Sequence, residues 1–244
     1  MKKSILIIPI LTVLGVSSCN VFKTENLRSF VWAYYEAESI RLSETDDGNI
    51  AMCYSNVKTV CDFKSKKQQK QLYDSLCYAR NDIGYNKTIT YFPMPMEPDA
   101  TELSINDIVS IDVVSDTDFS EQHPAGTSLN DIIRFAGTSI NEFLQSNYIY
   151  QYDWNNKPAD FPAESRFRGY PYHSPINKLL SEIKSEDLLS LTSDGFWFLL
   201  FEKEPTLSKK HELTITVKFD NGKVIVAHSM VGNSKKSTIT KVFE

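Results

Sequence analysis

LTITVKF at Leu213–Phe219, followed by DNG at 220–222 and KVIVAH at Lys223–His228, gives the clearest structural signal in the chain. Apolar and polar residues alternate on both sides of the central turn, a pattern typical of half-buried strands. Asn-Gly between two alternating runs is the strongest short-range signal for a β-hairpin. The stretch therefore predicts two antiparallel strands joined by a tight turn.

Similar patterns predict further strands along the chain. FWFLLF at Phe196–Phe201 is continuously apolar, which suits a strand buried on both faces. DIVSIDVVSD at Asp107–Asp116 alternates cleanly, and we expect Val109, Ile111 and Val113 to share its buried face. The remaining predicted strands cover 29–42, 50–54, 57–63, 87–92 and 237–243.

Helical spacing of apolar residues is rarer than strand alternation. It predicts a helix over 66–80, one or two short helices over 130–145, and a helix over 175–191. Strands outnumber helices, and no alternation of strands with long helices suggests a parallel sheet. We therefore predict a mainly β fold of the α+β class, with an antiparallel, sandwich-like sheet and short helices at its ends.

Composition excludes several classes of protein. Of the 244 residues, 41% are apolar and 12% aromatic, which is ordinary for a globular domain and unlike a disordered chain. The net charge of −5 gives no basic footprint for nucleic acid, so no nucleic-acid partner is expected.

The N-terminus has the layout of an export signal. Met1-Lys2-Lys3 is basic, and residues 5–16 form an apolar run of 12 residues, too short to cross a bilayer. The run ends in Val16-Ser17-Ser18-Cys19, which resembles the lipobox of bacterial lipoprotein precursors. This resemblance implies cleavage before Cys19 and attachment of diacylglycerol and palmitate-type chains to that residue.

The resemblance also divides the chain and places it in the cell. It implies a signal peptide over 1–18, a lipid anchor and tether over 19–28, and a single β-rich domain over 29–244. The membrane is then a partner through the N-terminal lipid, and the location is the bacterial cell envelope, on the periplasmic or surface face of the outer membrane. The body is similar in style to cell-envelope lipoproteins of Bacteroidota.

Loss of the signal peptide makes the charge more negative. Without Lys2 and Lys3 the net charge falls from −5 to −7. Anionic lipids repel such a body, so we expect the acyl chains alone to hold it, with no help from a basic patch.

Three cysteines remain after Cys19. Cys53 and Cys61 flank a turn predicted at Asn56-Val57, and Cys77 lies in the helix predicted over 66–80. One disulfide with a free thiol, or three unbridged thiols, are both possible from this count. We favour buried thiols, because a domain of this size needs no covalent staple.

No template for catalysis or metal binding is complete, so no catalytic residue, metal or cofactor is expected. His211-Glu212 begins a zinc-protease pattern and lacks its second histidine. Ser-x-x-Lys occurs at 55–58 and 181–184 without the partner motifs of penicillin-binding enzymes. The acidic residues at 112, 116, 118 and 121 lack the calcium-loop order and suggest a solvated loop.

One compositional feature stands out as a candidate ligand surface. Nine of the chain's 29 aromatic residues lie within 143–173. Either these rings pack over the sheet as part of a long loop, or some of them bind a glycan or a protein. The candidate ligand-binding residues are Tyr148, Tyr150, Tyr152, Trp154, Tyr170 and Tyr172.

These observations predict a lipid-anchored envelope protein whose domain serves a non-enzymatic binding or structural role. A glycan-binding lipoprotein that uses residues 148–172 is one alternative. An envelope hydrolase with a spatially assembled site is the other.

Overall fold

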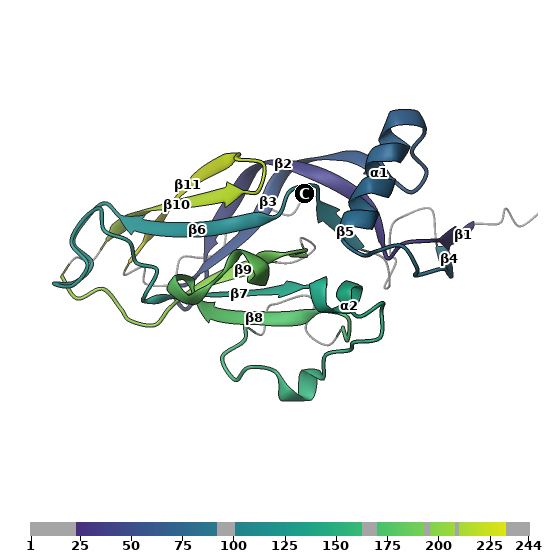
Figure 1. Ribbon diagram of the computed structural model, residues 1–244. Coiled ribbons are helices and arrows are strands. Elements are labelled where there is room, and N and C mark those ends of the chain that lie inside the picture. Colours follow the sequence, from purple (N-terminus) through teal and green to yellow (C-terminus); the bar gives the residue numbers. More distant parts are fainter. Residues whose placement is uncertain (1–22, 92–100, 163–169, 193–195, 208–209, 233–244) are drawn as a thin grey trace, which may run out of the picture.

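A computed structural model describes residues 23–91, 101–162, 170–192, 196–207 and 210–232 (Figure 1). Strands predominate in it, nearly all strand pairs are antiparallel, and the α-helices are short. The predicted fold class is confirmed: the chain is mainly β, sandwich-like, with added helices.

The larger sheet has six strands. Its one parallel pair joins the first two strands in the spatial order, and every other pair is antiparallel. In spatial order the strands are β5 (Thr101–Ser104), β2 (Val31–Glu44), β3 (Ile50–Asp62), β9 (Trp197–Phe201), β7 (Ile133–Ser139) and β8 (Ser174–Leu179).

The smaller sheet contains the predicted hairpin, which is confirmed. β10 (His211–Phe219) pairs with β11 (Val224–Val231) on one side and with β6 (Ile108–Ser115) on the other. Gly222 has φ +83°, the left-handed backbone that a tight hairpin turn requires. Apolar side chains from both sheets form the main hydrophobic core.

A second core lies at one end of the molecule, where α1, α2, β1 and β4 gather (Figure 1). α1 (Lys67–Ala79) and α2 (Asn141–Gln145) contribute Tyr73, Cys77 and Phe143 to it. β1 (Lys23–Leu27) pairs with β4 (Lys87–Tyr91) in a separate two-stranded sheet. This end of the fold is therefore stabilised by its own apolar cluster.

The segment over 19–28, predicted to be a tether, contains a strand. β1 occupies Lys23–Leu27, and Leu27 is buried in the second core. The mostly polar sequence concealed this strand, because a single buried leucine gives no alternation.

The two strands predicted over 50–54 and 57–63 form one continuous strand, β3. Asn56 has φ +52°, a backbone conformation that asparagine tolerates better than most residues. The chain therefore absorbs this residue as an irregularity within the strand, and the predicted turn does not form.

The helices predicted over 130–145 and 175–191 are largely wrong. Residues 133–139 form β7, and only Asn141–Gln145 is α-helical. Five consecutive residues of β7 are buried, so it lacks the alternation that identifies half-buried strands. The second segment begins as β8 and continues as two 3-10 helices, η2 (Leu180–Glu182) and η3 (Ser185–Leu188).

The buried face predicted for 107–116 is partly wrong. Ile111 and Val113 are buried as expected, but Val109 is exposed and Ile108 is buried instead. The pairing of β6 with β10 shifts register at Phe219, which faces Ile108. Residues 1–19 and the strand predicted over 237–243 lie outside the described residues.

Candidate binding surface

The aromatic segment predicted as a ligand surface lies in the loop between α2 and β8, at the bottom of Figure 1. A 3-10 helix, η1 (Trp154–Asn156), is its one regular element within the described part. Asp153 caps η1 by accepting a hydrogen bond from the Asn155 amide at 3.0 Å. The six candidate rings have three different environments in this loop.

Tyr148 and Tyr172 belong to the second core. The Tyr172 ring packs edge-on against Phe30, with 5.1 Å between ring centroids. The Tyr148 hydroxyl donates to Asp82 Oδ1 at 2.8 Å and accepts from the Gly84 amide at 3.1 Å. These two residues are therefore structural.

Tyr152 and Trp154 hold the loop together. Trp154 Nε1 donates to the Tyr170 carbonyl at 2.7 Å, and the Tyr152 hydroxyl donates to the Asn156 carbonyl at 3.1 Å. Trp154 also packs edge-on against buried Phe161, with centroids 5.5 Å apart. Both rings are half-buried, so their main role is to fix the course of the loop.

Tyr150 and Tyr170 are the most exposed of the six rings, each with 38% of its surface accessible. Ile149, beside Tyr150, is 79% exposed. Of the six candidate residues, Tyr150 and Tyr170 therefore remain available to a ligand. The half-buried Tyr152 and Trp154 are available only in part.

An open cavity of about 330 Å³ lies beside this loop. Phe198 and Leu200 of β9 line it, and both also belong to the small apolar cluster that contains Phe161 and Trp154. The aromatic loop and the cavity are therefore contiguous through shared packing. Charged side chains complete the lining: Asp47, Arg134, Asp160 and Glu202.

The charges around the cavity are partly fixed by hydrogen bonds. Arg134 Nε donates to Glu202 Oε1 at 2.5 Å. The Thr45 hydroxyl donates to Asp47, and this bond lowers the pKa of the Asp47 carboxyl. The lining thus combines three carboxylates and one guanidinium with apolar side chains, which suits a ligand that carries both hydroxyls and an apolar face.

The three cysteines are unbridged, as the favoured prediction stated. Cys61 and Cys77 are buried, whereas Cys53 is half-buried. Burial raises the pKa of the Cys61 thiol to about 11, and it raises the pKa of Cys77 as well. Neutral thiols of this kind are poor nucleophiles.

Ser120, His123 and Asp131 form a hydrogen-bond network that the sequence did not predict. Ser120 Oγ lies 2.9 Å from His123 Nδ1, and His123 Nε2 lies 2.9 Å from Asp131 Oδ1. Backbone bonds between Ser120 and His123 in both directions close a tight turn here. The His123 imidazole is nearly buried and connects two parts of one loop. We therefore interpret this hydrogen-bond network as structural.

Three of the carboxylates predicted to lie in a solvated acidic loop accept hydrogen bonds, and one of them, Asp112, belongs to strand β6. Asp112 accepts from the Ser128 hydroxyl, Asp116 from the Glu212 amide, and Asp118 from the Ala125 amide. In the described part of the chain, no three His, Cys, Asp or Glu side chains converge as a metal site would require.

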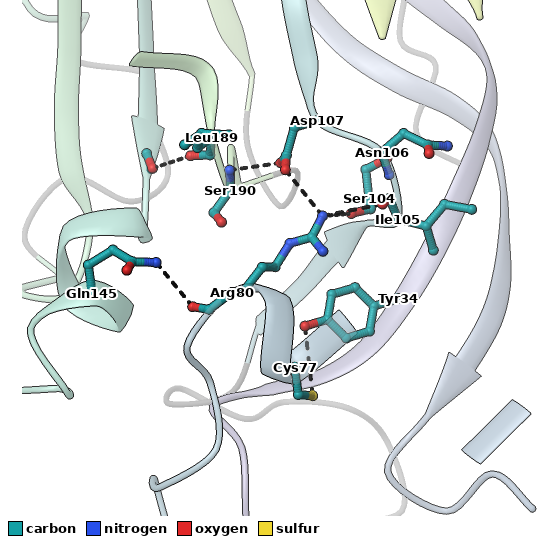
Figure 2. Close-up of polar contacts among 11 residues, drawn as sticks. Tyr34, Cys77, Arg80, Ser104, Ile105, Asn106, Asp107, Gln145, Leu189 and Ser190 are labelled. Carbon is teal, nitrogen blue, oxygen red and sulfur yellow. Dashed lines mark hydrogen bonds and ion pairs between the residues drawn. The ribbon is translucent and has the colours of Figure 1, made fainter. Parts of the chain in front are cut away.

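A second polar network, also missed from the sequence, joins α1 to β6 (Figure 2). Arg80 Nη2 donates to the Ser104 carbonyl at 3.2 Å and forms an ion pair with Asp107 Oδ2 at 3.3 Å. Asp107 Oδ1 accepts from the Ser190 amide at 2.9 Å. Nothing in the sequence pattern indicated that these two charges are buried together.

Comparison with known proteins adds no family to this description. A scan against protein-family models found no match, and searches of curated proteins and of solved structures found no similar chain. None of the helices in the described residues has the length and apolarity needed to span a bilayer.

Proposed function

We propose that the protein is a lipid-anchored protein of the bacterial cell envelope, and that its β-rich body is a non-enzymatic binding or structural domain. The order of the first 19 residues is the observation behind this proposal: a basic start, 12 apolar residues, then Val16-Ser17-Ser18-Cys19. Acylation at Cys19 would provide two or three chains, enough for stable anchoring.

The start of the folded domain is compatible with an anchor at Cys19. β1 begins at Lys23, so only three residues separate it from the cysteine. Four residue steps span at most about 14 Å of extended chain. An acylated Cys19 would therefore hold the domain directly against the bilayer.

The test is to follow acylation and membrane association of the full-length chain in a bacterial host. We expect palmitate labelling and partitioning into the detergent phase for the wild type, and loss of both for Cys19→Ala. Cys53→Ala serves as the control, because it removes a cysteine of β3 that lies outside the lipobox. This variant should behave as wild type. Unchanged labelling and partitioning of Cys19→Ala would overturn the proposal.

A glycan is the ligand that the candidate binding surface favours. Exposed Tyr150 and Tyr170 lie in the loop whose packing continues into the charged cavity. Aromatic faces stack on the apolar faces of sugar rings, while carboxylates accept bonds from sugar hydroxyls.

A glycan array followed by calorimetry tests this binding function. We expect a hit whose affinity falls at least tenfold in Tyr150→Ala/Tyr170→Ala, and a melting temperature still well above the assay temperature, so that the loss reflects binding rather than unfolding. Tyr78→Ala, which removes a 75% exposed ring on α1, is the matched control. An equal affinity in the double variant would contradict the assignment, and labelling of Ser120 by a fluorophosphonate would contradict a non-enzymatic role.

A further inference from the structure

Lysines gather at the end of the molecule where the described chain begins. Four of them lie within seven positions around the start of α1, and a fifth begins β4. All five are at least partly accessible to solvent. We call this set the basic surface: Lys64, Lys66, Lys67, Lys70 and Lys87.

Acidic side chains only partly neutralise the basic surface. Lys64 pairs with Glu25 of β1 at 2.8 Å, and Lys70 pairs with Asp74 one helical turn along α1. Within the described part of the chain, Lys66 and Lys67 make no ion pair. The surface therefore keeps a net positive charge, although the chain as a whole has a net charge of −5.

The position of the basic surface relative to Cys19 is restricted by chain length. Its contact with β1 is the Lys64–Glu25 ion pair, and Glu25 is six positions after Cys19. Six extended residues span at most about 21 Å. α1, β1 and β4 also lie at the same end of the fold, on the right in Figure 1.

We propose that the basic surface contacts anionic lipid headgroups in the bilayer that holds the Cys19 anchor, and so sets the orientation of the domain. This inference rests on the proposed lipid anchor. Lysines near an anionic bilayer each favour contact by about fivefold in binding constant, and the anchor removes the cost of bringing them there. The expectation that no basic patch assists the anchor is thereby replaced, because net charge conceals this local asymmetry.

Exposed side chains elsewhere on α1 fit the same environment. Tyr78 is 75% exposed and lies on the helical row that starts at Lys67. Tyrosine is enriched at the level of lipid headgroups, where its ring and hydroxyl meet both phases. α1 thus presents lysines in its first turn and a tyrosine in its last turn, with Asp74, the partner of Lys70, between them.

The test uses the full acylated protein in vesicles of phosphatidylcholine alone or with about one third phosphatidylglycerol. A soluble amine-reactive reagent acetylates lysines, and mass spectrometry gives the rate at each position. We expect Lys66 and Lys67 to react at least fivefold more slowly on the anionic vesicles. Lys203 and Lys210, exposed residues of the connection between β9 and β10, should react equally on both.

A charge-reversed variant provides the second measurement. Lys66→Glu/Lys67→Glu/Lys70→Glu should abolish the protection of Lys64 and Lys87, whereas the matched control Lys203→Glu/Lys210→Glu should retain it. Equal rates on both vesicle types in an acylated wild type would overturn this inference alone. Absence of acyl chains from the intact protein mass would overturn the proposed function and this inference with it.

Discussion

At the scale of single residues, Asp82 holds the beginning of the domain in place. Its carboxylate accepts from the Phe30 amide at 2.6 Å, the Val31 amide at 2.8 Å and the Tyr148 hydroxyl. It is fully buried, and this burial raises the pKa of the carboxyl. One side chain thus satisfies donors from two segments that are more than 100 positions apart in the sequence.

We expect Asp82→Ala to lower the free energy of unfolding by about 3 kcal/mol, because it leaves two buried amides without an acceptor. Tyr148→Phe should lower it by only about 1 kcal/mol, because a single hydrogen bond is lost. Urea unfolding followed by tryptophan fluorescence measures both changes. Asp74→Ala on the exposed side of α1 is the control, and an equal effect of Asp74→Ala and Asp82→Ala would refute the role given to Asp82.

His173 makes stability depend on pH. It is 1% exposed among aromatic rings, and burial lowers its pKa from 6.5 to about 3. Below pH 6.5 the unfolded chain gains a proton that the folded chain does not, so stability is greatest above pH 6.5 and decreases as pH falls. The decrease approaches about 1.4 kcal/mol per pH unit until the folded pKa is reached.

Chemical unfolding at pH 7, 6, 5 and 4 tests this contribution. His173→Leu should remove the decrease in stability between pH 6.5 and pH 4. The raised pKa values of Asp82 and Asp107 have the opposite effect on stability at low pH. As the pH falls, the folded state binds protons at these carboxyls before the unfolded state does, and this stabilises the folded state. A decrease in stability from pH 6.5 to pH 4 that persists in His173→Leu would show that another group is responsible.

At the scale of elements, the sequence predicted the strands and the helix whose apolar residues follow a regular spacing. The hairpin of β10 and β11, strand β2, strand β9 and helix α1 were all predicted near their observed bounds. β7 was missed for a physical reason. Five consecutive residues of β7 are buried, so the strand shows no alternation, and Phe135 and Trp197 atoms lie within about 3 Å of where a Gly137 Cβ would be.

The candidate site shows the same limit. Clustering of aromatic residues located the loop, but sequence could not show that Tyr148 and Tyr172 pack into the second core while Tyr150 is more exposed. The cavity was also invisible, because its lining comes from the β2–β3 turn, β7, β9 and the aromatic loop. Such sites depend on contacts between distant segments, which local patterns do not encode.

The irregularity in β3 gives a prediction about a single element. Asn56 has a left-handed backbone, and its side-chain amide donates to Ser39 Oγ of β2 at 3.0 Å. We expect Asn56→Val to lower the free energy of unfolding by about 1–2 kcal/mol, because a branched side chain is strained at this φ. Asn56→Gly should be nearly neutral in the same unfolding assay, and equal losses in both variants would exclude backbone strain as the cause.

At the scale of the whole molecule, Arg80 and Asp107 join the two hydrophobic cores. Arg80 ends α1 in the second core, and Asp107 precedes β6 in the main core. The guanidinium also lies over the Tyr34 ring, 5.2 Å from its centroid. Figure 2 shows the Arg80 guanidinium between Asp107 and the Ser104 and Ile105 carbonyls, which accept its hydrogen bonds.

Breaking the Arg80–Asp107 ion pair should lower the free energy of unfolding of the whole domain. We expect Asp107→Ala to cost about 3–5 kcal/mol, since it leaves the Arg80 charge buried without its partner. Arg80→Met/Asp107→Leu should recover part of that loss. Lys178→Ala, which breaks the more exposed pair with Asp187, should cost less than about 1 kcal/mol when all variants are compared by scanning calorimetry. Equal losses for both pairs would contradict this account.

The pairing of β3 with β9 has a consequence for biogenesis. Ile50 is aligned with Leu199, about 150 positions later, so the larger sheet cannot form completely until the chain has been synthesised beyond β9. Such non-local topology delays acquisition of the native state to milliseconds or longer. During this interval the nascent chain exposes apolar strands, which makes it a substrate for molecular chaperones.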